Sequence, residues 1–165
     1  MKVLDLAAAL QKAYRLLSMR PHSEKELEKK LREKGFSPVI VKEALEKLHE
    51  LKYLDDALFA RQWARNLAVN KLCGSRKIIV SLQGKGVAAE LISTAIDEAR
   101  REISEEEAII FLIKKKAARK KLDTLDLKEK KRIFQNLRGR GFPAGLILNK
   151  LGRIAQGEFD GENGE

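Results

Sequence analysis

The hydrophobic and polar positions of this chain follow the same pattern three times. The segment LREKGFSPVIVKEALEKL (31–48) returns as LQGKGVAAELISTAIDEA (82–99) and again as LRGRGFPAGLILNKLGRI (137–154). In each copy a leucine is followed three positions later by a basic residue, and then by a glycine and an apolar residue. The apolar positions beyond the glycine recur at the spacing of one face of an α-helix. This internal repeat predicts that one local structure is built three times.

Each copy is predicted to fold as a helix, a glycine turn and a second helix. Glycine readily takes the left-handed backbone conformation that ends many helices, and a basic residue before it suits the negative end of the helix dipole. These turns are expected at Lys34-Gly35, Lys85-Gly86 and Arg140-Gly141. Pro38 and Pro143 follow two of the turns, and proline is compatible with the first turn of the next helix.

A further helix is predicted before each pair. The first is expected over residues 4–17, and the one in the second copy starts at Asp55 or Asp56. A capping box consists of a serine or aspartate with a glutamate three residues later, and it marks a helix start. This pattern occurs at Ser23 and Glu26, at Ser104 and Glu107, and at Asp126 and Glu129.

These elements predict an all-α fold of three tandem three-helix, helix-turn-helix-like repeats in an elongated array. We expect repeat 1 over residues 1–54, repeat 2 over 55–103, repeat 3 over 104–156, and an acidic flexible tail over 157–165. A unit of about 50 residues is marginally stable alone, so neighbouring repeats are expected to pack on one another. An array of this kind suits an extended ligand.

Composition restricts the setting in which such a protein works. Hydrophobic residues make up 44% of the chain and charged residues 35%, which is enough apolar side chain for a packed core. There is one cysteine, Cys73, so an internal disulfide is excluded and a cytoplasmic location is expected. The sequence has no cleavable signal pattern and no apolar run of membrane-spanning length, so neither secretion nor membrane insertion is expected.

The net charge of +10 is concentrated in one third of the chain. Residues 1–54 carry +4, residues 55–103 carry +2, residues 104–156 carry +8, and residues 157–165 carry −4. This distribution predicts a polyanionic partner such as nucleic acid, and the alternative is a solvated helix surface. The candidate basic patch consists of Lys114, Lys115, Lys116, Arg119, Lys120, Lys121, Lys128, Lys131, Arg132, Arg138 and Arg140.

No arrangement typical of catalysis or metal binding is found in the sequence. His22 and His49 have no cysteine or carboxylate at zinc-ligand spacing, and no nucleophile motif is present. GKGVAA (84–89) and GRGFPA (139–144) match a dinucleotide-binding pattern, but predicted helices rather than strands precede them. We therefore expect no enzyme activity, cofactor, metal or small-molecule substrate. Phosphate binding at the helix starts after these turns remains an alternative.

Two aromatic sites are assigned mainly to the core. Phe59 and Trp63 have helical i, i+4 spacing and are expected to pack inside repeat 2, with a partly exposed partner-binding edge as the alternative. In repeat 3 the residues expected to face the core are Ala108, Phe111, Leu112, Ala118 and Leu122. This choice leaves most of the lysines that follow on the outer surface.

The repeated helices also resemble a helix-turn-helix, in which the last helix enters the major groove of DNA. The outward positions of those helices include acidic residues in the first two copies, and these positions lack the arginine, asparagine and glutamine that read base edges. The acidic positions are Glu43, Glu46, Glu50, Glu90, Asp97 and Glu98. Any DNA contact is therefore expected to be to the backbone.

The chain resembles the RecX family of recombination regulators. The similarity is carried by the block Tyr53, Leu54, Asp55, Asp56, Phe59 and Trp63, by Arg76 and Lys77 after Gly74-Ser75, and by Lys85 in the second glycine turn. His22-Ser23 with Glu26-Leu27, and Gly141-Phe142, are similar to that family as well. The resemblance extends to about residue 154.

The resemblance implies a monomer that binds the RecA filament, contacts the single-stranded DNA backbone through that filament, and regulates recombination and repair. It would restrain filament growth, ATP hydrolysis, strand exchange and co-protease activity, and the block above would contact the partner. The chain departs from the family pattern at Leu67, at Ile79-Val80-Ser81, and by one extra residue between Leu67 and Gly74. The alternative is a stand-alone, non-specific DNA-binding protein.

Overall fold

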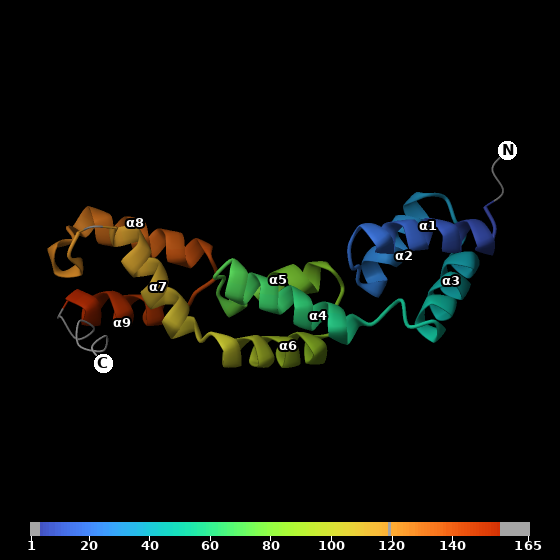
Figure 1. Cartoon of the computed structure of the whole chain (residues 1–165). Helices are drawn as coiled ribbons and strands as arrows, with labels where there is room; N and C mark the ends of the chain where they lie inside the picture. The colour runs from blue at the N-terminus through green and yellow to red at the C-terminus, as the bar shows by residue number, and fades with distance from the viewer. Residues whose placement is uncertain (1–3, 119, 156–165) are drawn as a thin grey trace. The chain divides into compact units, whose positions relative to one another are not determined.

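The computed structural model describes residues 4–118 and 120–155, and all regular structure within them is helical (Figure 1). These residues form nine α-helices: α1 (Leu6–Met19), α2 (Glu24–Glu33), α3 (Pro38–Glu50), α4 (Asp56–Arg65), α5 (Ser75–Gly84), α6 (Ala89–Glu102), α7 (Glu105–Ala117), α8 (Leu127–Gly139) and α9 (Ala144–Ala155). The predicted all-α class is confirmed, and the first helix starts and ends two residues later than predicted. No helix in this part of the chain is long and apolar enough to cross a membrane.

Contacts divide the chain into two compact units. The first takes in the described residues up to Ala64 together with Ser81–Ala95. The second takes in Arg65–Val80 and the described residues from Ile96 onward. Helices α5 and α6 therefore contribute residues to both units.

In the first unit, α1, α2 and α3 pack against one another around an apolar core (Figure 1). Helix α2 is mostly charged and buries only Leu27 and Leu31, which lie one turn apart and face α1 and α3. Burying side chains of this size contributes about 1.5 to 3 kcal/mol each, and this narrow stripe supplies the buried apolar contacts of the helix. The core consists of Ala9, Ala13, Leu27, Leu31, Phe36, Val41, Ala44, Leu45, Leu48 and Leu54.

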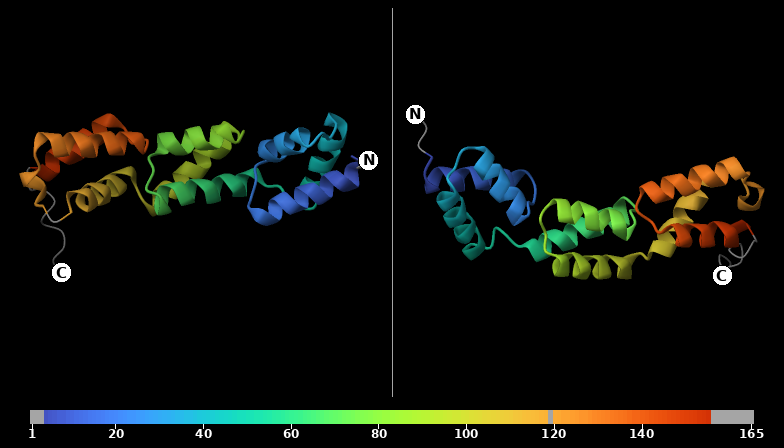
Figure 2. Two further views of the ribbon diagram at one scale, coloured as in Figure 1. Left: turned by 90° about the horizontal axis from the view of Figure 1, so that it is seen from above. Right: turned by 180° about the vertical axis from the view of Figure 1, so that it is seen from behind.

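In the second unit, α7, α8 and α9 enclose a separate core (Figure 2). Phe142 is the largest side chain in it and is fully buried. Lys150 on α9 is also buried, and its ammonium group lies 2.5 Å from the Glu106 carboxylate at the start of α7. The core consists of Ala108, Ile109, Leu112, Ile113, Ala117, Leu125, Ile133, Leu137, Phe142, Ile147 and Leu151.

The three predicted capping boxes are present. Ser23, Ser104 and Asp126 each accept a hydrogen bond from the backbone N–H of the glutamate three residues later, and that glutamate accepts one from the N–H of the cap. Ser37 caps α3 in a similar way, with Pro38 in the first turn of the helix. These local hydrogen bonds satisfy backbone groups that a helix start leaves unpaired.

The glycine turn is built the same way in all three copies. Gly35, Gly86 and Gly141 have φ of +90°, +71° and +90°. The residue after each glycine donates its N–H to the carbonyl of the leucine five positions earlier, at 3.2 to 3.3 Å. This is the Schellman arrangement, in which a left-handed glycine ends the helix. The predicted turns are confirmed.

A π-helical turn, η1 (Asn66–Asn70), follows α4. The Lys71 N–H donates to the Asn66 carbonyl at 3.1 Å, which is the five-residue spacing of a π-helix. A π-helical turn accommodates one more residue than an α-helical turn.

The predicted core face of α7 is wrong in part. Ala108 and Leu112 are buried as expected and Leu122 is partly buried, but Phe111 is 55% exposed and Ala118 is also exposed. Ile109, Ile113 and Ala117 take the buried positions in their place. Because the run AIIFLI is apolar throughout, its pattern does not select one face, and packing against α8 and α9 decides.

Candidate functional site

The aspartates of the family block cap two helices in the first unit. Asp55 accepts the N–H of Leu58 at 2.9 Å and so caps α4. Asp56 accepts the N–H of Glu24 at 2.9 Å, at the start of α2. Burial raises the pKa of Asp56, and the hydrogen bond from Glu24 opposes this shift. Both carboxylates have structural partners, and Asp56 joins α2 to α4.

The other members of the block differ in exposure. Leu54 is buried, whereas Tyr53 is 56% exposed and has an edge-to-face contact with Tyr14 at 5.1 Å between ring centres. Phe59 is buried, but Trp63 is only partly buried, so the expectation that both lie in a core holds fully for Phe59 alone. Of these four, Tyr53 presents the largest accessible fraction.

Trp63 lies between two other side chains of the family pattern. Its ring stacks on Phe59 at 5.6 Å between centres, and the Lys85 ammonium group lies 4.2 Å from its centre. The indole N–H donates to the Ser81 hydroxyl at 2.9 Å. Phe59, Trp63 and Lys85 are thus brought together as one stack.

Glu26 ties this stack to α2. Its carboxylate is 2.7 Å from the Lys85 ammonium group and 3.0 Å from the Arg20 guanidinium, and it also accepts the N–H of Ser23. The Ser23 hydroxyl donates to the Lys85 carbonyl at 2.5 Å. Burial acts to raise the pKa of Glu26, but hydrogen bonds from Arg20, Lys85 and Ser23 outweigh it and lower the pKa to about 2. The sequence identified Glu26 as a capping residue and as part of the family resemblance, but it did not predict the ion pairs with Arg20 and Lys85.

Arg76 and Lys77 lie in the first turn of α5, in the second unit, and both side chains are exposed. The backbone beside them is tightly packed. A Cβ atom on Gly141 would lie 2.6 Å from the Lys77 nitrogen, and the Gly74 N–H donates to the Arg140 carbonyl at 2.8 Å. The third glycine turn therefore packs against the start of α5.

The candidate basic patch lies on α7, on α8 and in the segment between them. Its exposed members are Lys114, Lys115, Lys116, Lys120, Lys121, Lys128, Lys131, Arg132 and Arg138. Lys120 forms an ion pair with Glu129, and Arg138 donates to the Phe142 carbonyl at 3.3 Å. Arg140 is partly buried and donates to the Lys71 carbonyl at 2.7 Å, so it has a structural partner. Arg119 lies outside the described residues, as does the acidic tail.

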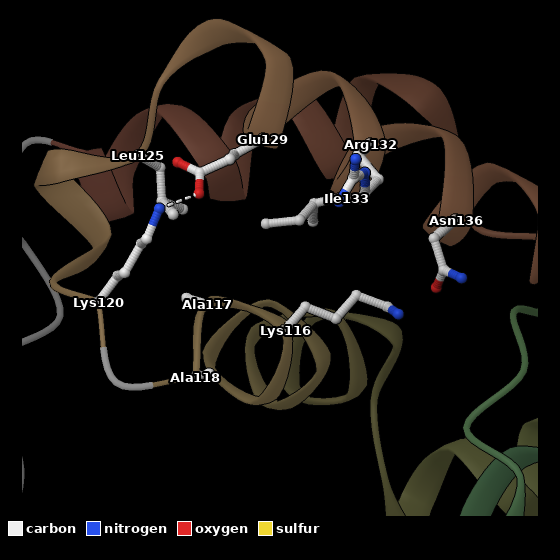
Figure 3. A pocket seen from close by; sticks show the side chains of 9 residues that line it. All are labelled: Lys116, Ala117, Ala118, Lys120, Leu125, Glu129, Arg132, Ile133 and Asn136. Atoms are coloured by element: carbon white, nitrogen blue, oxygen red, sulfur yellow. Dashed lines mark hydrogen bonds and ion pairs between the residues drawn. The ribbon is translucent and has the colours of Figure 1, made fainter.

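A groove of about 680 Å³ lies between α7 and α8 within this patch (Figure 3). Ile133 points into it, and the Lys116 side chain runs along it toward the end at which Asn136 lies. The Lys120–Glu129 ion pair closes the other end. The lining consists of Lys116, Ala117, Ala118, Lys120, Leu125, Glu129, Arg132, Ile133 and Asn136. The groove combines an apolar floor with a mainly cationic rim.

The chain is similar to RecX proteins over most of its length. Residues 9–48 match the family profile for the first three-helix domain of RecX, and residues 55–96 match that for the second. Regulatory protein RecX of Syntrophotalea carbinolica is 30% identical over 140 residues, which are 85% of this chain and 92% of that protein. Regulatory protein RecX of Chlorobaculum tepidum is 36% identical over 139 residues, which are 82% of this chain and 81% of that protein.

Solved structures share the fold. The crystal structure of RecX from Lactobacillus salivarius matches this chain with a TM-score of 0.77 at 22% identity, covering 92% of this chain and 97% of that one. A second crystal structure, of regulatory protein RecX, matches with a TM-score of 0.71 at 24% identity, covering 87% of this chain and 71% of that one.

Proposed function

The chain belongs to the RecX family, and from this premise we propose that it binds the RecA filament on single-stranded DNA and restrains it. Binding would slow filament growth and ATP hydrolysis, and with them strand exchange and co-protease activity. The protein would act in recombination, repair and the SOS response as a monomeric cytoplasmic regulator without enzyme activity of its own. The observation that carries the proposal is the match to RecX proteins over more than four fifths of the chain.

The distribution of charge supports a DNA contact at the second unit. Exposed lysines and arginines on α7 and α8 form a surface to which phosphates would bind without reading bases. Helix α3, by contrast, exposes Glu43, Glu46 and Glu50, which would repel a DNA backbone. The patch on α7 and α8 therefore takes the DNA in this proposal.

Contacts to RecA are assigned to the accessible members of the family pattern. Tyr53, Arg76 and Lys77 are exposed and are free to meet a partner protein. Asp55, Asp56, Phe59 and Lys85 have partners inside the first unit, so they support the surface rather than form it. We also propose that the chain consists of three repeats, over residues 1–54, 55–103 and 104–156.

The proposal is tested by comparing the affinity for bare single-stranded DNA with the affinity for the same strand coated by RecA, at matched salt. We expect tighter binding to the coated strand and slower ATP hydrolysis by RecA. Equal affinity for both would favour the alternative, a stand-alone and non-specific DNA-binding protein. That alternative is considered because the basic patch alone would bind DNA.

A further inference from the structure

We propose that the groove between α7 and α8 holds one unstacked nucleotide of single-stranded DNA. This inference rests on the proposed function, and it adds a site with defined chemistry to a surface otherwise described only by its charge. The base would lie on the apolar floor, its phosphate would be bound by Lys116 and Arg132, and Asn136 would donate to the edge of the base.

The floor of the groove suits the flat face of a base. Ile133 points into its centre, and Ala117 and Leu125 line it as well (Figure 3). Ala117, Leu125 and Ile133 are 4 to 7% exposed, so the floor is the edge of the hydrophobic core. Enzymes that extrude a base from DNA bind it between aromatic or apolar side chains. The volume of about 680 Å³ lies within the range of small-molecule sites and exceeds what a bare phosphate needs.

Lys116 and Arg132 supply cations on the two facing walls of the groove. Lys116 forms no ion pair with any residue in the described part of the chain, and its side chain lies along the groove. Arg132 lines the facing wall on α8. Glu129 is the carboxylate of the lining, and it is bound to Lys120 and to the N–H of Asp126. The negative charge of Glu129 is thus offset at the end of the groove away from Asn136.

Asn136 is held in place by the glycine turn that follows its helix. Its side-chain oxygen accepts from the Arg140 guanidinium at 3.3 Å, and Arg140 in turn donates to the Lys71 carbonyl. The amide NH₂ group forms no hydrogen bond with the described part of the chain, so it is the donor that Asn136 can offer to a base at this end of the groove. A donor there matches the carbonyl oxygens and ring nitrogens on the edge of a base.

Two sources could supply a nucleotide, namely a DNA strand or a free mononucleotide. The surroundings favour the strand. Exposed lysines continue on both helices beyond the groove, at Lys114, Lys115, Lys128 and Lys131. A free nucleotide would be too short to contact these lysines, whereas a strand would place successive phosphates along them.

The test uses the full chain without RecA, so its failure leaves the filament proposal standing. Binding is measured by fluorescence anisotropy with a labelled single-stranded oligonucleotide and with an abasic strand of the same length. Asn136→Ala is compared with Asn149→Ala, which removes an exposed asparagine on α9 outside the groove. A double variant, Lys116→Ala with Arg132→Ala, is compared with a second double variant, Lys114→Ala with Lys128→Ala. Each removes one positive charge from α7 and one from α8.

We expect N136A to weaken binding of the base-bearing strand about tenfold and to leave binding of the abasic strand unchanged. The Lys116 and Arg132 pair should weaken binding about tenfold more than its control pair. The four positions changed in the charge variants are all exposed, so these variants should fold even if N136A does not. They are Lys114, Lys116, Lys128 and Arg132. The inference is wrong if each variant behaves as its control, if the protein does not bind the bare strand, or if adenosine monophosphate binds as tightly as the oligonucleotide.

Discussion

Replacing Glu26 with glutamine tests whether the carboxylate that joins α2 to the glycine turn of Gly86 holds the first unit together. Glutamine keeps an oxygen that can accept the Ser23 N–H, but it removes the charge that faces Arg20 and Lys85. The Glu26 and Lys85 side chains are 14% and 17% exposed, so this ion pair is largely shielded from water. The change therefore isolates the charge from the helix cap.

The expected magnitude follows from the pKa of Glu26. The pKa falls from 4.5 to about 2 on folding, and each unit corresponds to about 1.4 kcal/mol. Because the Arg20 side chain is 39% exposed, solvent weakens its share, and we expect a loss of about 2 to 3 kcal/mol at neutral pH. A carboxylate with a lowered pKa stabilises the fold above its unfolded pKa. That contribution is lost as the pH falls from about 4.5 toward 2.

Urea unfolding followed by circular dichroism measures both effects. At pH 7, E26Q should be less stable than the unmodified chain, and the difference should shrink as the pH is lowered through 4 toward 3. The control is Glu33→Gln on the same helix, because Glu33 is 60% exposed and its ion pair with Lys29 spans 3.9 Å. It should change stability by less than about 0.5 kcal/mol. A difference that stays constant with pH, or that equals the control at pH 7, would refute the reasoning.

Three further outcomes are expected. Phe142→Ala should lower the free energy of unfolding by about 3 to 5 kcal/mol because Phe142 is fully buried. Phe111→Ala should lower it by less than about 1 kcal/mol because Phe111 is 55% exposed. Equal losses in urea unfolding would mean that Phe111 lies in the core, as the sequence predicted. Gly141→Ala should destabilise the fold through its φ of +90° and the approach of Lys77, while Gly139→Ala in open space at the end of α8 should raise stability by up to about 1 kcal/mol; unchanged stability of G141A would contradict the turn. Reversing Lys114, Lys116 and Lys121 to glutamate should reduce the slope of log affinity for single-stranded DNA against log salt by about 2, and an unchanged slope would mean that the patch is only a solvated surface.

The sequence predicted the elements whose causes are local. A capping box or a glycine turn is completed within six residues, so Ser104 with Glu107, and Gly141 with Phe142, could be identified before any tertiary contact was known. The buried face of α7 could not, because six consecutive apolar residues satisfy several helix rotations equally well. Only the packing of α7 against α8 and α9 excludes Phe111 from the core.

Counting charges in the sequence likewise does not show which basic side chains are available to a ligand. Lys120 and Arg140 add to the positive charge of the basic patch, yet the first is paired with Glu129 and the second is bound to a backbone carbonyl. Side chains of the same type, such as Lys116, are left to bind an anion. The difference depends on partners that are distant in sequence, as with Arg140 and Lys71, which are 69 positions apart. Composition predicts that a basic surface exists, and the structure decides which of its residues are available.

The same distinction changes how the family block should be tested. Phe59, Trp63 and Lys85 form a stack that Glu26 joins to α2, so removing any of them weakens the first unit before it alters a contact with a partner. Loss of filament binding in such variants would then reflect a less stable fold and not a lost contact with the partner. Tyr53 is exposed and is not part of this stack, so its removal would leave the stack intact. It is therefore among the residues of the block whose substitution can separate the proposed contact with RecA from the stability of the fold.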